Sequence, residues 1–187
     1  RGMKLDFIDV HRAYFHAKAR RDDFVELPEE DAQEGMCGML IKSMYGTRDA
    51  AQNWEKEYSD FMETERFIPG KASPCVFRHP ERKLRVVIHG DDFTILGGEL
   101  DLDWFRERIA NSFEVKFRGR LGPAEGDDKR IRILNRGNEW TDMGMRDEPD
   151  QRHTEIIMRN LGLENDSKSV VTPTCKVEFE GAEEPLR

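Results

Sequence analysis

Long hydrophobic runs are missing from this 187-residue sequence, and cysteines are few. No apolar stretch approaches the ~20 residues that cross a bilayer, and no secretory or transit segment is visible at the start. Cys37, Cys75 and Cys175 are widely spaced and form no C-x-x-C pair. This spacing argues against a zinc site and for reduced thiols, so we expect an intracellular protein.

An excess of basic charge is also missing, because 30 Lys and Arg stand against 38 Asp and Glu, a net charge of -8. This total argues against a nucleic-acid binder, which usually has a basic surface. Residues 116–136, however, hold seven Lys and Arg against three Asp and Glu. Lys116, Arg118 and Arg120 alternate with less polar residues, which on a strand predicts one basic face. Such a face could bind phosphates or simply be solvated.

The length allows one domain with a core, alone or with an appended piece. At 36% charged and 37% hydrophobic residues, the composition is that of a polar globular protein. The first residue is Arg1 rather than Met, so we expect a piece of a longer protein.

Two apolar runs rich in β-branched residues flank Gly90-Asp91-Asp92, which predicts a β-hairpin with carboxylates at its turn. Carboxylates beside buried strands are costly unless a cation or solvent compensates their charge. Mg²⁺ prefers such hard oxygens. Gly-Asp-Asp is also common turn chemistry, so an ordinary turn is the alternative.

A third carboxylate, Asp9, follows the apolar pair Phe7-Ile8 in a predicted strand. If this strand lies beside the hairpin, three carboxylates converge, and two metals roughly 4 Å apart could support nucleotidyl transfer. A second Gly-Asp-Asp, at residues 126–128, has no apolar strand before it, so we predict an ordinary turn there.

Periodicity predicts an α+β fold. Apolar residues at helical spacing predict helices at 49–67, with Asp49 as N-cap, at 100–113, and after a cap at Asp150. The acidic tail after Pro173 is expected to be poorly ordered. Residues 4–14 are predicted as a strand, with 5–10 at its centre, that runs into a short turn or helix. The other predicted strands are 24–27, 36–44, 75–79, 84–88, 93–96, 113–117, and a hairpin of 130–134 with 139–143.

Several motifs occur in a recognisable order along nearly the whole chain. They are Asp9-Val10-x-x-Ala13-Tyr14, Lys42-Ser43-Met44-Tyr45-Gly46-x-x-x-Ala50, Trp54, Lys71-Ala72-Ser73-Pro74-Cys75-Val76-Phe77, Asp91-Asp92 and Phe113-Glu114-Val115-Lys116. In order and spacing this set resembles the reverse transcriptase of copia-type retrotransposons.

The resemblance implies an RNA-directed DNA polymerase. Residues 1–122 would be its palm with a remnant of the fingers, a ferredoxin-like split β-α-β with an antiparallel sheet and two packed helices. Residues 123–187 would be a thumb- or connection-like hairpin and helix with a disordered acidic tail. The implied partners are an RNA or DNA template-primer, dNTPs, and the integrase and ribonuclease H of a pol polyprotein. No membrane is implied, and the location would be a cytoplasmic particle or the nucleus.

The resemblance also implies a set of site residues. The catalytic and metal-binding residues would be Asp9, Asp91 and Asp92, with Mg²⁺ or Mn²⁺ as cofactor. The nucleotide-binding residues would be Val10, Tyr14, Tyr45, Gly46 and Arg48, with Tyr14 as the steric gate against a 2′-hydroxyl. The nucleic-acid-binding residues would be His89, Lys116, Arg118 and Arg120.

Some positions depart from the family pattern. His89-Gly90 stands where Tyr-Val is usual, and Asp49 and Ala51 stand where Gln and Pro are usual. Two other functions are therefore kept open: a catalytically inactive fragment or decayed remnant, and a non-enzymatic nucleic-acid-binding module of ferredoxin-like fold. Because the upstream fingers precede Arg1 in the family, we expect this fragment alone to have little activity.

Overall fold

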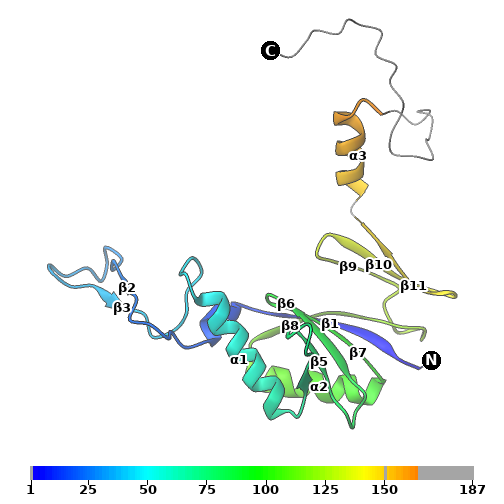
Figure 1. The fold of residues 1–187 in the computed structure, drawn as a ribbon, viewed down its shortest axis with the longest axis horizontal. Helices are drawn as coiled ribbons and strands as arrows, with labels where there is room; N and C mark the ends of the chain where they lie inside the picture. The colour runs from blue at the N-terminus through cyan, green and yellow to red at the C-terminus, as the bar shows by residue number, and fades with distance from the viewer. Residues whose placement is uncertain (1, 150, 164–187) are drawn as a thin grey trace, which may run out of the picture. The chain divides into compact units, whose positions relative to one another are not determined.

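The computed structural model describes residues 2–149 and 151–163, and Figure 1 labels its helices and strands. The chain divides into two compact units, Arg1–Glu148 and Pro149–Arg187. The described part of the second unit is a helix, α3 (Gln151–Asn160), and the turn that follows it. Among the described residues, no helix is both long and apolar enough to cross a membrane.

A six-stranded sheet is the centre of the first unit. Its strands lie in the order β4-β5-β6-β7-β1-β8, and every neighbouring pair is antiparallel. The first and the last strand of this sheet along the sequence, β1 and β8, are therefore neighbours. They are β1 (Lys4–Val10), β4 (Ile68–Pro69), β5 (Val76–Arg78), β6 (Arg85–His89), β7 (Asp92–Gly97) and β8 (Val115–Leu121).

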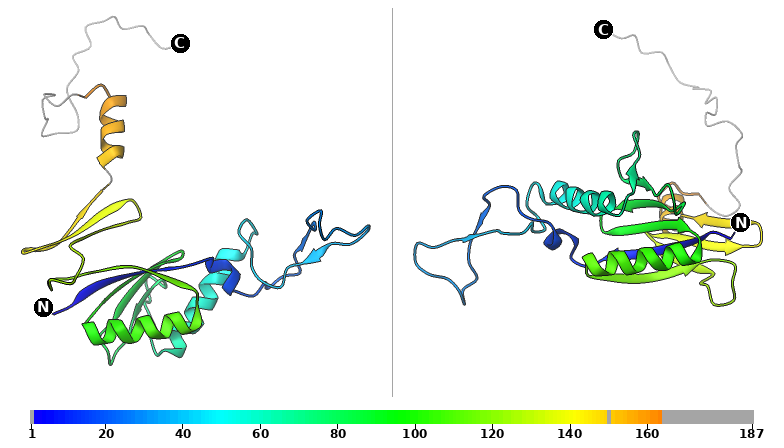
Figure 2. Two further views of the ribbon diagram at one scale, coloured as in Figure 1. Left: turned by 180° about the vertical axis from the view of Figure 1, so that it is seen from behind. Right: turned by 90° about the horizontal axis from the view of Figure 1, so that it is seen from below.

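Two helices, α1 (Ala50–Thr64) and α2 (Glu99–Ser112), cover one face of this sheet (Figure 2). Buried and more exposed residues alternate along β6 and β7, because successive side chains of a strand point to opposite faces. The buried residues pack against the apolar stripes of both helices in a single core. Its members include Ile8, Val86, Ile95, Trp54, Met62, Phe105 and Ile109.

The other face of the sheet, which we call the open face, carries a smaller apolar cluster. Phe7 and Leu121 pack there against Ile131 of a second, three-stranded sheet. The predicted boundary after residue 122 therefore does not coincide with a break in packing, because Ile131 lies against strands formed by earlier residues. The strands of this sheet are β9 (Arg130–Ile133), β10 (Arg136–Thr141) and β11 (Gly144–Glu148).

The predicted class, an α+β fold with antiparallel sheets, is confirmed, whereas several lengths differ. The predicted 24–27 and 36–44 strands are only the two-residue strands β2 (Phe24–Val25) and β3 (Gly38–Met39). Most side chains of this region are exposed, so little packing holds a longer ladder. A short 3-10 helix, η1 (Ala13–His16), follows β1, and the predicted 130–143 hairpin gains β11 as a third strand.

Asp49 precedes α1 as predicted, but its side chain makes no capping hydrogen bond. Its carboxylate instead accepts a hydrogen bond from Arg21 at 3.3 Å, which competes for the same oxygens. The predicted cap at Asp150 and the tail after Pro173 lie outside the described residues.

The pairing of β1 with β8 contains a β-bulge. The register shifts between Phe7 and Ile8, so that Arg118 is the extra residue of β8. The next residue, Gly119, has a φ of 149°, and a Cβ atom there would lie 2.5 Å from a carboxylate oxygen of Asp128. A larger residue would therefore strain the bulge or displace Asp128.

This bulge shows that the prediction of one face for Lys116, Arg118 and Arg120 was wrong. Lys116 pairs with Asp9 on the open face, whereas Arg120 pairs with Asp6 on the helix face. The extra residue interrupts the simple alternation of faces on which the prediction depended. Arg120 is thus removed from the predicted nucleic-acid surface.

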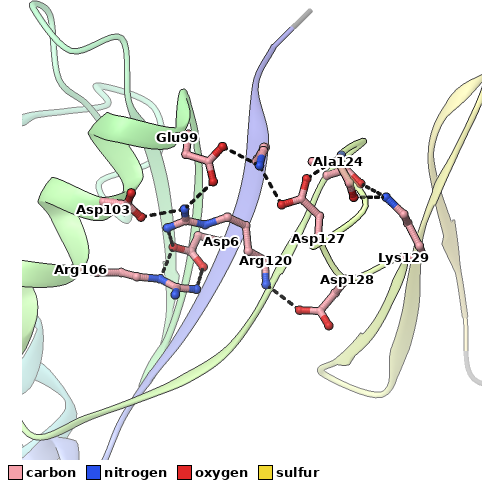
Figure 3. A network of polar contacts seen from close by, with 11 residues as sticks. Asp6, Glu99, Asp103, Arg106, Arg120, Ala124, Asp127, Asp128 and Lys129 are labelled. Atoms are coloured by element: carbon pink, nitrogen blue, oxygen red, sulfur yellow. Dashed lines mark hydrogen bonds and ion pairs between the residues drawn. The ribbon is translucent and has the colours of Figure 1, made fainter.

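Arg120 belongs instead to a network of ion pairs between β1, β8 and α2 (Figure 3). Asp6 is 1% exposed and accepts hydrogen bonds from Arg120 at 3.0 Å and from two nitrogens of Arg106. Arg120 also donates to Asp103 at 2.7 Å. The buried carboxylate is therefore compensated by two guanidinium groups, as a buried charge must be.

Of the second Gly-Asp-Asp, Gly126 lies in a turn, as predicted, and Asp128 forms an isolated bridge with Leu121. Asp127 accepts a hydrogen bond from the Lys4 ammonium at 2.7 Å. Asp128 accepts one from the backbone N–H of Arg120 at 2.9 Å. Both carboxylates therefore fasten the loop after β8 to the sheet.

We predict that Asp6→Asn lowers the free energy of unfolding by about 3 kcal/mol, because one partner of a buried ion pair is removed and the other charge stays buried. Urea unfolding followed by circular dichroism measures this change. The matched control is Asp103→Asn, whose side chain is 58% exposed. It should lose less than about 1 kcal/mol, and an equal loss for both variants would contradict the structural role of Asp6.

Candidate active site

Asp9 and Asp92 lie directly opposite each other on neighbouring strands, as partners in the register of β1 with β7. Directly opposed residues of antiparallel strands project from the same face, with Cβ atoms about 4.5–5.5 Å apart. Ile8 and Val10, on either side of Asp9, are buried in the core beneath the helices. Both carboxylates therefore lie on the open face, and the predicted placement of Asp9 beside the hairpin is confirmed.

Asp91 lies in the two-residue turn between β6 and β7. His89 and Asp92 are paired residues at the two ends of this turn, so the predicted hairpin is confirmed. Gly90 has a φ of 63°, which glycine adopts without strain. The carbonyl oxygen of Asp91 accepts a hydrogen bond from the N–H of Val10 at 2.9 Å, which ties the turn to the end of β1.

A second hydrogen bond holds this turn from the helix side. The indole N–H of Trp54, a residue of α1 that is 1% exposed, donates to the carbonyl oxygen of Gly90 at 2.8 Å. The sequence predicted Trp54 as a core residue, which is confirmed, but its contact with the turn was missed. The helical spacing of apolar residues indicates that a tryptophan is buried, without indicating where its N–H points.

The acidic residues influence each other's charge. Burial raises the pKa of Asp92 above its ordinary value of 3.8, and the neighbouring carboxylates of Asp91 and Asp9 raise it further. Arg118 and His89 act in the opposite direction. The negative charge of Asp92 is therefore incompletely compensated by the protein itself.

Arg118 is the nearest compensating charge. Its Nη2 donates to the Oδ2 of Asp9 at 2.6 Å, and this hydrogen bond raises the pKa of Arg118. Arg118 was predicted to contact nucleic acid, and the structure shows that it contacts a carboxylate of the candidate site.

The chemistry of this donor set suits a divalent metal. Three carboxylates at the adjoining ends of β1, β6 and β7 offer hard oxygens, which Mg²⁺ and Mn²⁺ prefer. Within the part of the chain that the structure describes, however, no three His, Cys, Asp or Glu side chains are grouped to hold an ion. Arg118 binds the Oδ2 of Asp9, so a cation at this oxygen would compete with the guanidinium.

Two of the residues predicted to bind nucleotide form an aromatic stack. The rings of Tyr14 and Tyr45 lie 4.3 Å apart at 23°, and Phe15 meets Tyr45 edge-on. Tyr14 is half-buried, whereas Gly46 and Arg48 are exposed in the loop before α1. The structure therefore brings Tyr45 to the predicted steric gate.

The remaining predicted residues border the carboxylates in different ways. The side chain of Val10 is fully buried, so only its main chain adjoins the site. His89 and Lys116 are exposed and pair across the strands with Asp92 and Asp9, respectively. Two predicted basic contacts thus remain on the open face beside the carboxylates.

A hollow of about 320 Å³ adjoins Asp92 on the open face. Asp92 and Arg118 line one side, and the turn between β9 and β10 lines the other. That turn consists of Leu134 and Asn135, both with positive φ, as a two-residue turn of type I′ requires. The lining residues are Asp92, Arg118, Arg132, Ile133, Leu134 and Asn135.

Comparison with known proteins shows the family to which the chain belongs. Residues 2–125 match the family described as reverse transcriptase (RNA-dependent DNA polymerase). The chain belongs to this reverse transcriptase family. It is also 27% identical, over 180 residues, to the retrovirus-related Pol polyprotein from transposon TNT 1-94 of Nicotiana tabacum. That alignment covers 91% of this chain and 13% of the relative, so this reverse transcriptase chain spans a small part of the polyprotein. The resemblance to copia-type retrotransposons is thereby confirmed.

We predict that Trp54→Phe lowers the free energy of unfolding by about 1 kcal/mol more than Trp104→Phe, because only the former loses a hydrogen bond. The indole N–H of Trp104, on α2, donates to no other described residue. Both changes remove the same atoms, and denaturant unfolding compares them. Equal losses would show that the Gly90 contact adds nothing to stability.

We also predict that, in EDTA at about pH 7, Asp92→Asn is more stable than the wild type. Since the folded state raises the pKa of Asp92 above 3.8, the folded protein binds this proton more tightly than the unfolded chain. The contribution of Asp92 to stability therefore decreases as the pH rises from 3.8 through the folded pKa. The gain should shrink towards acidic pH, whereas Asp142→Asn, in the turn after β10, should show no such trend. A gain that is independent of pH would contradict the assignment.

Proposed function

We propose that this chain contains the palm of an RNA-directed DNA polymerase of a copia-like retrotransposon. The observation that carries the proposal is the register that sets Asp9 opposite Asp92, with Asp91 in the adjoining turn. The sheet order β6-β7-β1-β8, with α1 and α2 on one face, supports a ferredoxin-like split β-α-β for this palm. Membership in the reverse transcriptase family supports the reaction class.

The proposed reaction extends a primer by one nucleotide. The 3′-oxygen of the primer forms a bond to the α-phosphorus of a dNTP, the bond from that phosphorus to the β-phosphate bridging oxygen breaks, pyrophosphate leaves, and the hydroxyl proton passes to solvent. When bound, two Mg²⁺ ions would favour loss of that proton and neutralise the leaving group. Asp9 and Asp91 would hold the ions, and Asp92 would lie beside them.

Residues of the 3-10 helix η1 and of the open face would position the substrates. Tyr14 would lie under the sugar of the dNTP and exclude a 2′-hydroxyl, with Tyr45 stacked behind it at 4.3 Å. His89 and Lys116 are exposed beside the carboxylates, where a phosphate backbone would be attracted. The proposed partners are an RNA or DNA template-primer, dNTPs and the other domains of a Pol polyprotein.

A second candidate, a catalytically inactive remnant, is favoured by one specific observation. The ion pair of Arg118 with Asp9 occupies one of the two carboxylate oxygens of Asp9 that a metal could bind. A remnant of this kind would keep the fold and lack chemistry. A folded protein preparation that shows neither Mg²⁺ binding nor primer extension would indicate this candidate.

We predict that Asp91→Asn reduces Mg²⁺-dependent primer extension by at least about a hundredfold, the usual effect of removing one electrostatic stabiliser of a transition state. Since we expect the isolated chain to be a weak polymerase, extension of a labelled primer is measured with enzyme in excess. The matched control, Asp128→Asn in the second Gly-Asp-Asp, should extend the primer at close to the wild-type rate. Activity that survives Asp91→Asn would remove the assignment of the catalytic carboxylates.

A further inference from the structure

We infer that Arg118 is the resident counter-ion of Asp9 and competes with the divalent cation for this carboxylate. The inference rests on the proposed function, because it concerns the affinity of the proposed metal site. It assigns Arg118 a role that differs from the predicted contact with nucleic acid.

The backbone of β8 places Arg118 beside Asp9. As the extra residue of the bulge, it has no partner on β1 in the strand register, which leaves its side chain free of the strict alternation of faces. Gly119 allows the bulge, and Asp128 holds the following residue by its backbone N–H. Arg118 is therefore placed against Asp9 by the fold of β8 rather than by a flexible loop.

The contact with Asp9 is direct. The Nη2 of Arg118 lies 2.6 Å from the Oδ2 of Asp9, whose side chain is 18% exposed. A divalent cation bound at Asp9 would compete for this oxygen, and its charge would repel the guanidinium. Either the arginine or the cation can therefore occupy this oxygen of Asp9.

The surroundings of Arg118 would allow its side chain to leave Asp9. The side chain of Arg118 is 43% exposed and makes one hydrogen bond to Asp9. By contrast, Arg106 holds the buried Asp6 with two nitrogens and has little freedom to leave. The hollow of about 320 Å³ beside Arg118 gives the displaced guanidinium a place within the site.

The test is a titration of the full 187-residue chain with Mn²⁺, with free Mn²⁺ measured by electron paramagnetic resonance. Arg118→Leu should bind Mn²⁺ about three- to fivefold more tightly than the wild type, the factor that an exposed ion pair is worth. Arg118→Lys, which keeps the charge, should stay within about twofold of the wild type.

Arg85→Leu is the matched control for net charge. Arg85 begins β6 on the same open face, at the end of the strand opposite His89, and it is exposed. Its replacement should change the Mn²⁺ affinity by less than about twofold, because salt screens the interaction between an exposed arginine and a distant metal ion. A gain for Arg85→Leu equal to that for Arg118→Leu would show a general charge effect and overturn the inference.

Thermal unfolding gives a second readout. In EDTA, Arg118→Leu should melt about 2–4 °C below the wild type, since three neighbouring carboxylates lose their closest cation. Saturating Mn²⁺ should close this gap, because the metal replaces the lost charge.

Two results would overturn the inference. Unchanged or weaker Mn²⁺ binding by Arg118→Leu would show that the arginine does not compete. In that case the proposed function would still stand if the wild type binds Mn²⁺ and Asp9→Asn abolishes this binding. If neither the wild type nor Arg118→Leu binds Mn²⁺, the metal site of the proposed function fails together with the inference.

Discussion

The antiparallel pairing of β1 with β7 is the constraint on which the candidate site depends. It sets Asp9 opposite Asp92, although the two residues are far apart in the sequence. The same pairing brings the end of β1 to the turn that carries Asp91, where the N–H of Val10 binds the carbonyl oxygen of that residue. A shift of one residue in this register would turn Asp9 into the core and an isoleucine or valine to the open face.

The carboxylates on the two faces of the sheet differ in how their charge is compensated. On the helix face, Asp6 is buried and fully compensated by Arg106 and Arg120, which suits a structural role. On the open face, Asp92 keeps a raised pKa because burial and two other carboxylates disfavour its charge. A nearby positive charge favours the ionised form of Asp92, and Arg118 acts in this direction.

The core beneath the turn holds it through one hydrogen bond. Trp54 belongs to the same apolar cluster that joins both helices to the sheet, and its N–H binds Gly90 at 2.8 Å. Packing of α1 is therefore coupled to the position of the carboxylates through one hydrogen bond. A site on strand ends, supported by a buried aromatic residue, is held more precisely than one on a long loop.

The sequence by itself determined the class of fold, the two helices under the sheet, the hairpin around Asp91 and Asp92, and the family. These features depend on local periodicity, turn residues and ordered motifs, all of which are written along the chain. Only the tertiary structure decided that Arg120 leaves the open face, that Trp54 holds the turn and that Arg118 binds Asp9. The reason is physical: a bulge at one position changes the face of every later residue, and contacts of single polar atoms depend on the packing of distant segments, neither of which has a periodic signal.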